Sequence, residues 1–300
     1  MSSGSPRPVV VVMGGASSEH QVSLDSGAAV MRALGSAGRI ATRVLVGKDG
    51  RWDSGSGPRT EIQGMGALPE HAICFLALHG GEGESGVLQA RLQEAGIDYT
   101  GSGPEPSRRA FDKESSREAA VSFGIRVAPG LVVDRSAWIA SQSETLDRVA
   151  QQGWGTVFVK PVCSGSSVGV TRATGAIEID SAIETALIEG RRVLVEEVVE
   201  GVEVSCGVLE GASGMAAALM PVEIRPQKAR FFTTEEKYQA DGAVEVCPPD
   251  SIENGMVEEV RHLALAIHEG MGLRGMSRSD FIVDPEGPVF LEVNTTPGLT

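Results

Sequence analysis

The sequence has few cysteines, no surplus of basic residues and no long apolar run near its start, and each shortage excludes a class of protein. The four cysteines lie far apart and form no CxxC pair; they are Cys74, Cys163, Cys206 and Cys247. Neither a zinc site nor a disulfide framework is therefore indicated. A reducing cytoplasm is the expected location.

The charge balance argues against nucleic acid as a partner. The chain has 26 Lys and Arg against 40 Asp and Glu, a formal net charge of −14. Binding to a phosphate backbone normally needs a basic stripe, although a few local cations can still hold a nucleotide. The apolar run VVVVM (9–13) is too short for a signal-peptide core or a membrane span. We therefore expect no membrane partner.

The size and the pattern of the chain predict an α/β protein of more than one part. At 300 residues, with 41% hydrophobic residues, the chain exceeds the range of a single growing core. Apolar runs at 9–13 and 72–78 read as buried strands, and the segments 23–38 and 86–96 read as helices. This alternation predicts an N-terminal β/α domain with a parallel sheet.

The remaining chain predicts two further α+β parts. In the first, we expect one helix over 107–124, followed by strands at 156–162, 167–173 and 192–199. In the second, we expect strands at 202–209 and 216–224, a polar loop at 230–249, a helix at 251–270 and a closing hairpin. No repeat, low-complexity tract or long linker interrupts the pattern.

The closing hairpin predicts a polar cluster. The turn DPEG (284–287) has the residues of a type I turn closed by a left-handed glycine, which pairs Asp284 with Pro288. Asp280 then faces Glu292 and Arg278 faces Asn294, all on one side of the sheet. If this polar face were merely exposed to solvent, the opposite face would still form the core. The residues of that opposite face are Ser279, Phe281, Val283, Leu291 and Val293. The oxygen ligands beside an arginine favour Mg²⁺ that bridges substrate phosphates.

Gly-rich loops supply a weaker signal for phosphate binding. Lys160 ends a strand and is followed by CSGSSVG, whose glycines would let backbone N–H groups approach an anion. Such a loop matches no P-loop pattern, and alone it reads better as a plain hairpin turn. The same holds for VMGGASSEH near the start.

Taken together, the motifs resemble one family. GGASSEHQVSLDSG, LALHGGEGESGVLQ, YTGSG, DKESSR, VKPVCSGSSVGV, VEEVVEGVEV, EEKY, SRSDFIV and LEVNTTPG occur in an order and spacing similar to those of D-alanine–D-alanine ligases of the ATP-grasp superfamily. The resemblance runs from residue 9 to residue 300. It implies an ATP-grasp fold in three parts, 1–104, 105–196 and 197–300, with ATP held between the second and third.

The resemblance also implies ligand-binding roles. Lys113, Lys160 and Lys237 would contact ATP phosphates. Asp280, Glu292 and Asn294 would bind two Mg²⁺, with Mn²⁺ as an alternative metal. The adenine and ribose would be held by a further group of residues: Glu196, Glu197, Val199, Glu203 and Phe231.

The implied reaction joins two D-alanine molecules. ATP would convert the first carboxylate to an acylphosphate, which the amine of the second D-alanine attacks. Arg278 would stabilise the transferring phosphoryl group, and Glu19 would accept the ammonium of the first D-alanine. The other implied site residues are His79 near the first substrate, Ser166 and Tyr238 in a hydrogen-bonded set with Glu19, and the Gly298 amide toward an oxyanion.

The chain departs from the family pattern at several points. Ser164 stands where the family's loop usually has Glu, Ser85 gives GESG in place of GEDG, and Gln21 replaces a frequent Glu. The sequence stops at Thr300, where relatives continue toward the second substrate. We expect either that the chain is cut short or that its second subsite is weak.

Three alternatives stay open at this point. A D-alanine–D-lactate ligase would share nearly every motif but usually lacks the tyrosine of EKY. Another ATP-grasp carboxylate–amine ligase would not need Glu19, His79 and Tyr238 together. A non-catalytic nucleotide-binding paralogue is disfavoured by the intact set around Arg278. The sequence leaves a homodimer open as an assembly.

Overall fold

The computed structural model describes residues 6–165, 168–226 and 243–299. Contacts divide the chain into two compact units. The first joins the residues up to Arg108 with Gly272–Ser277 and the residues from Asn294 onward. The second contains Arg109–Met271 and Arg278–Val293. The division into three parts at 104 and 196 stays a prediction.

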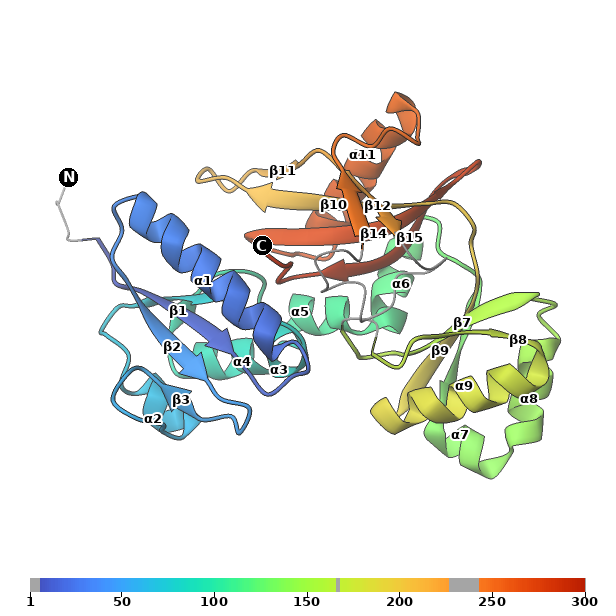
Figure 1. The fold of residues 1–300 in the computed structure, drawn as a ribbon, viewed down its shortest axis with the longest axis horizontal. Coiled ribbons are helices and arrows are strands. Elements are labelled where there is room, and N and C mark those ends of the chain that lie inside the picture. Colours follow the sequence, from blue (N-terminus) through green and yellow to red (C-terminus); the bar gives the residue numbers. More distant parts are fainter. Residues whose placement is uncertain (1–5, 166–167, 227–242, 300) are drawn as a thin grey trace. The chain divides into compact units, whose positions relative to one another are not determined.

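The first unit is built on a five-stranded sheet in the order β3-β2-β1-β4-β5. Figure 1 labels β1, β2 and β3 of this sheet. The central strand β1 (Val9–Gly14) pairs in parallel with its neighbours on both sides, as predicted for this apolar run. The other strands are β2 (Ala41–Val46), β3 (Trp52–Asp53), β4 (Ile73–Leu76) and β5 (Asp98–Tyr99). The run VVVVM supplies both faces of the sheet: Val10 and Val12 belong to one core cluster, and Val11 and Met13 to another.

Helix α1 (His20–Ser36) packs closely on this sheet. A side chain at Gly27 would lie 2.6 Å from Met13 Cβ, so glycine permits the approach of the helix to β1. The helices predicted at 23–38 and 86–96 correspond to α1 and α4, with shifted ends. The other helices that begin in this unit are α2 (Glu61–Met65), α3 (Gly81–Glu84), α4 (Val87–Glu94) and α5 (Pro104–Phe111).

The second unit begins with a break that the sequence reading missed. The single helix predicted over 107–124 is wrong, because the chain forms α5 and then α6 (Lys113–Ser122). Asp112 between them has an extended backbone and accepts a hydrogen bond from the Ser115 amide at 2.9 Å. The extended backbone at Asp112 interrupts the helical path, and its side chain caps the new helix.

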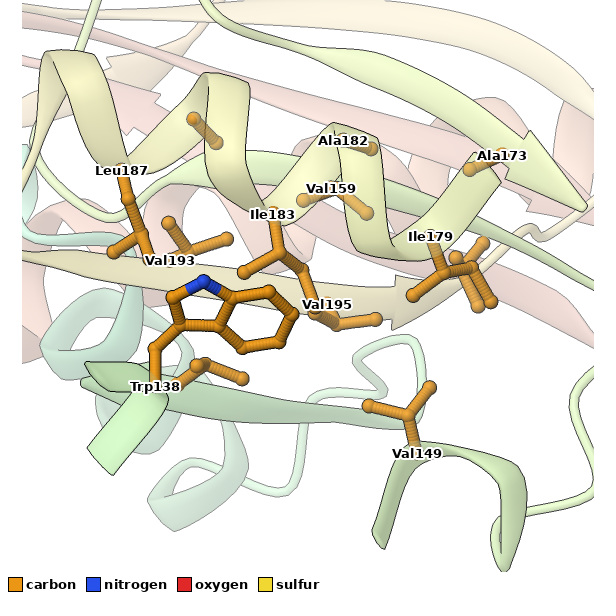
Figure 2. Packing of buried hydrophobic residues seen from close by; sticks show 13 residues of the cluster. Trp138, Val149, Val159, Ala173, Ile179, Ala182, Ile183, Leu187, Val193 and Val195 are labelled. Carbon is orange, nitrogen blue, oxygen red and sulfur yellow. The ribbon is translucent and has the colours of Figure 1, made fainter. Parts of the chain in front are cut away.

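An antiparallel sheet in the order β6-β9-β7-β8 follows. Its strands are β6 (Gly130–Asp134), β7 (Thr156–Pro161), β8 (Thr171–Thr174) and β9 (Arg192–Glu197). One face carries the core cluster shown in Figure 2, where Trp138, Ile183, Val193 and Val195 pack together. The strand predicted at 167–173 begins only at Thr171. The helices that pack beside the sheet are α7 (Arg135–Ala140), α8 (Gln142–Ala150) and α9 (Gly175–Glu189).

A second sheet has the order β13-β12-β10-β14-β15, with β11 paired to β10. The strands are β10 (Val202–Glu210), β11 (Ala216–Ala218), β12 (Val222–Pro226), β13 (Ala243–Val246), β14 (Met276–Asp284) and β15 (Gly287–Asn294). The single strand predicted at 216–224 is wrong, since Pro221 lies between β11 and β12 and has no N–H for a ladder. The predicted helix at 251–270 is present as α11 (Asn254–Gly270).

The closing hairpin is present, but only two residues separate β14 from β15 where the sequence predicted a three-residue loop, and the pairing of Asp284 with Pro288 stays a prediction. Pro285 and Glu286 connect β14 to β15, and the Glu286 amide donates to Asp284 Oδ1 at 2.7 Å. Gly287 has a φ of 127°, a backbone conformation that glycine adopts without strain. In the described part of the chain, no helix is long and apolar enough to cross a bilayer.

Candidate active site

A cavity of about 400 Å³ lies in the second unit. Its walls come from strands of both sheets of this unit, namely β7, β9, β10, β12, β14 and β15. This volume is within the range of sites that hold small molecules and cofactors. Several residues selected from the sequence therefore line one cavity.

Two buried lysines line this cavity. Lys113 begins α6 and is 6% exposed; its Nζ donates to the Ser164 carbonyl at 2.6 Å and lies 3.3 Å from Glu292 Oε2. Lys160 lies on β7 and pairs with the Glu196 carboxylate. Buried ammonium groups on a cavity wall suit phosphate oxygens, because charge-assisted hydrogen bonds are stronger away from water.

A carboxylate pair lines the same cavity. Asp280 on β14 accepts hydrogen bonds from Arg278 Nε at 2.8 Å and from Arg278 Nη2 at 2.9 Å. Ser205 Oγ donates to Asp280 Oδ1 at 2.7 Å. Glu292 on β15 is the second carboxylate. The structure thus brings Asp280 and Glu292 to one wall, with Arg278 fixed beside them.

The third predicted metal ligand, Asn294, is the last residue of β15 and belongs to the first unit. In the described residues, no group of three or more His, Cys, Asp or Glu side chains is placed to hold a metal. The predicted set has two carboxylates and one amide. Mg²⁺ is commonly held by one or two carboxylates together with substrate phosphates, so the donors in the cavity fit that ion.

The residues expected to hold the adenine and ribose also line the cavity. They are Glu196, Glu197, Val199 and Glu203, and apolar side chains of Phe158, Ile282 and Leu291 lie in the same walls. The expectation that Leu291 packs in the core was wrong, because Leu291 is half-buried and lines the cavity. An apolar wall of this kind suits the flat face of a base.

Acidic side chains outnumber basic ones around the cavity. Among its described lining residues there are seven carboxylates but three cationic groups. Since Glu196, Asp280 and Glu292 already pair with Lys160, Arg278 and Lys113, the side chains leave little positive charge for a polyphosphate. This balance is a second observation that fits metal ions bound together with a nucleotide.

The first unit contains a separate cluster around His79. This side chain is 4% exposed; its Nδ1 lies 2.8 Å from the Thr296 carbonyl oxygen and its Nε2 lies 2.8 Å from Ser26 Oγ. Glu84 Oε1 lies 3.8 Å from His79 Nδ1. Burial raises the pKa of the Glu84 carboxyl, His79 opposes the rise, and the charge of Glu19 adds to it.

Glu19 and Gly298 belong to the same unit. A side chain at Gly80 would clash with Glu19 Oε2, so the carboxylate lies directly against that glycine. Beside Gly298, the Leu299 amide donates to Ser26 Oγ at 3.3 Å, and Ser26 is also the partner of His79. Leu299 is therefore bound directly to Ser26 of α1, and Thr296 is linked to the same serine through His79. Four predicted site residues, Ser166, Phe231, Lys237 and Tyr238, lie outside the described residues.

Comparison with known proteins decides the family. A family model described as the D-ala D-ala ligase C-terminus matches residues 120–300, more than half of the chain. The chain belongs to the D-alanine–D-alanine ligase family. A ligase of that name from Leptospira interrogans is 33% identical over 318 residues, which span 97% of this chain and 90% of the relative.

Solved structures of ligases of this family share the fold. The D-alanyl-alanine synthetase A from Vibrio cholerae has a TM-score of 0.84 and 28% identity, over 99% of this chain and 90% of that one. The VanG D-Ala:D-Ser ligase from Enterococcus faecalis has a TM-score of 0.84 and 26% identity, over 99% of this chain and 92% of that one. The predicted ATP-grasp fold is confirmed.

Sequence reasoning missed several polar residues of this ligase. Arg117 donates a hydrogen bond to Glu196, and Ser205 donates one to Asp280. Glu84 is buried beside His79. The alternation of β10 puts Ser205 on the same face as Glu203, which could have indicated Ser205. No pattern in the sequence distinguishes Arg117 from the other charged residues of its helix.

Proposed function

We propose that this chain joins two D-alanine molecules to D-alanyl-D-alanine through an acylphosphate, with ATP converted to ADP and phosphate, for the synthesis of peptidoglycan precursors. The carrying observation is the cavity that joins Lys113 and Lys160 to Asp280 and Glu292. Membership of the D-alanine–D-alanine ligase family supports the choice of reaction.

The nucleotide would occupy this cavity. Lys113 and Lys160 hold phosphate oxygens, and the apolar side chains of Ile282 and Leu291 pack on the adenine. The Glu197 and Val199 segment supplies backbone groups for the base, and Glu203 reaches the ribose. Lys237 and Phe231 are further expected contacts. Most of the protein's part in phosphoryl transfer is positioning and charge neutralisation, which this set provides without a nucleophile.

Asp280, Glu292 and Asn294 would hold two Mg²⁺, with Mn²⁺ as an alternative. Bound Mg²⁺ supplies the positive charge that phosphate oxygens need in an acidic cavity. Arg278 keeps its guanidinium beside the transferring phosphoryl group, because Asp280 accepts two of its hydrogen bonds. A fixed arginine costs little reorganisation when charge develops.

The first D-alanine would be bound by residues of the first unit. Glu19 accepts the ammonium group, His79 lies near the substrate and the Gly298 amide faces an oxyanion. The hydrogen bonds of His79 to Thr296 and Ser26 support this role, because they fix the imidazole orientation. Ser166 and Tyr238 complete the proposed set with Glu19 and exclude water from the acylphosphate.

A second acceptor class must be tested beside D-alanine, because one structural relative is described as a D-Ala:D-Ser ligase. Phosphate release would be measured with ATP, Mg²⁺ and D-alanine alone, then with D-alanine plus D-serine, D-lactate or L-alanine, and products would be resolved by mass spectrometry. We expect D-alanyl-D-alanine to dominate. A mixed product with D-serine or D-lactate as the main outcome would overturn the acceptor assignment, and no phosphate release in any mixture would overturn the reaction.

Location and assembly complete the proposal. We place the enzyme in the cytoplasm, where ATP is available, and include a homodimer as the assembly to test. Light scattering during gel filtration gives the mass in solution. A mass of one chain at all concentrations would remove the dimer from the proposal without affecting the reaction.

A further inference from the structure

Glu196 binds two cations at once in the wall of the cavity. Its side chain is 3% exposed, and the partners Lys160 and Arg117 are 9% and 10% exposed. Lys160 Nζ pairs with one carboxylate oxygen, Oε1. Arg117 Nη1 donates to the other, Oε2, at 2.7 Å. The three side chains form a buried triad with a net charge of +1.

Glu196 lines the cavity, whereas Arg117 is not among the described residues that line it. It lies on α6, four residues after Lys113, so both side chains project from one face of the helix. Its Nη2 donates to the Ala128 carbonyl, just before β6. Arg117 therefore ties the helix that carries Lys113 to the strand that carries Glu196.

The charge of this triad bears on Lys160. A lone Glu196–Lys160 pair would be neutral, and in a buried site the carboxylate would hold the ammonium strongly. Because Arg117 shares the carboxylate, it weakens the hold of Glu196 on Lys160. A guanidinium suits this position better than an ammonium, since its fixed fork reaches a carboxylate and a carbonyl in two directions.

We propose that Arg117 is a positioning residue for nucleotide binding, which acts through Glu196 to keep Lys160 available to phosphate oxygens. This proposal rests on the proposed function, because it assumes that the cavity binds a nucleotide. It predicts an effect that depends on phosphate groups. Loss of Arg117 should lower the affinity for ligands that carry phosphates and leave the affinity for ligands with base and sugar alone unchanged.

The first test is calorimetric titration of the whole chain with ATP, ADP and adenosine at fixed Mg²⁺. We expect Arg117→Gln to lower the affinity for ATP and ADP about tenfold, which is the effect of losing one coupled interaction of ordinary size. The affinity for adenosine should fall less than twofold. Arg117→Lys keeps the charge but loses the fork, so it should recover only part of the loss. Equal weakening of all three ligands, or none, would overturn the positioning role.

A matched control separates this role from general structure. Arg135 also donates to backbone carbonyls, of Leu187 and Gly190, but contacts no carboxylate of the cavity. Arg135→Gln should leave the ATP-to-adenosine affinity ratio unchanged. If Arg117→Gln does not fold, the smaller phosphate-dependent loss in Arg117→Lys decides the question, and an unchanged ratio in that variant counts against the proposal.

A double-mutant cycle tests the route of the effect. In a Glu196→Gln background the carboxylate charge is absent, so Arg117→Gln should change ATP affinity less than twofold. The same tenfold loss in both backgrounds would show that Arg117 does not act through Glu196. Wild-type chain that binds neither ATP nor ADP would overturn the proposed function itself, whereas normal ATP binding by Arg117→Gln overturns the role of Arg117 alone.

Discussion

Lys113 Nζ lies 3.3 Å from Glu292 Oε2, so the first residue of α6 is bound to β15 across 179 positions of sequence. The lysine also donates to the Ser164 carbonyl at 2.6 Å. This ammonium therefore connects a helix start, a Gly/Ser loop and a carboxylate expected to hold metal. Changes at any of the three should alter nucleotide binding.

Glu292→Gln should nearly abolish ATP-dependent turnover, by about 100-fold or more, while the fold stays intact. The substitution removes a negative charge from a proposed metal ligand but keeps its size. Phosphate release and thermal unfolding would be measured side by side. Glu286→Gln is the matched control, because Glu286 is exposed and pairs with Arg126 at the hairpin turn. Near-normal turnover in the Glu292 variant would sink the metal assignment.

The N-cap of α6 gives a second prediction. Asp112 accepts from the Ser115 amide and pairs with Arg192, so it fixes the helix start that carries Lys113. Asp112→Ala should lower the unfolding free energy by about 1–2 kcal/mol and the affinity for ATP roughly fivefold. Urea unfolding and calorimetric titration give the two values.

The control for this variant is another N-cap. Ser141 caps α8 by accepting from the Glu144 amide at 3.3 Å, on a helix that does not line the cavity. Ser141→Ala should lose about 1 kcal/mol of stability without loss of ATP affinity. If the two variants lose stability alike and both bind ATP normally, Asp112 does not position Lys113.

Ser279 supplies a prediction about stability. It is fully buried on β14, and among the described residues its hydroxyl has no hydrogen-bond partner. Ser279→Ala should therefore raise the unfolding free energy by about 1 kcal/mol, because a buried hydroxyl without a partner costs desolvation. Ser107→Ala is the contrast, since the equally buried Ser107 donates to the Ser102 carbonyl. A decrease in stability in both variants would contradict the account.

Local patterns predicted the elements of this fold well where one factor decided the structure. The run at Val9–Met13 is apolar throughout because both faces of β1 are covered. Two predictions failed where a single residue broke a continuous pattern. Asp112 starts a new helix inside a helical stretch, and Pro221 interrupts an apolar stretch that otherwise suits a strand.

The site was predictable as far as its residues lie in recognisable motifs. Lys113, Lys160, Asp280 and Glu292, which the resemblance singled out, line one cavity, and their binding roles stay predictions. Their supporting partners were not predictable, because these contacts join distant parts of the chain. Arg117 and Glu196 are 79 positions apart, and Ser205 and Asp280 are 75 apart. No periodicity within one element can indicate such pairs.

The pKa of the Glu84 carboxyl gives the last prediction. Burial raises it above the ordinary value of 4.5, and Glu19 adds to the rise although His79 opposes it. A raised pKa means that the folded chain binds more protons than the unfolded chain at pH values above 4.5. The contribution of this carboxyl to stability is therefore full below 4.5 and is lost as pH rises through the folded pKa.

Glu84→Gln removes this dependence, because an amide does not ionise. The unfolding free energy of the variant minus that of wild type should therefore increase as pH rises above 4.5 and level off once pH exceeds the folded pKa. Glu70→Gln serves as control, since Glu70 is exposed and the substitution makes the same chemical change at the surface. Urea unfolding at each pH supplies the values for all three chains. A flat difference for Glu84→Gln over the whole range would show that the buried carboxyl keeps its ordinary pKa in the folded chain.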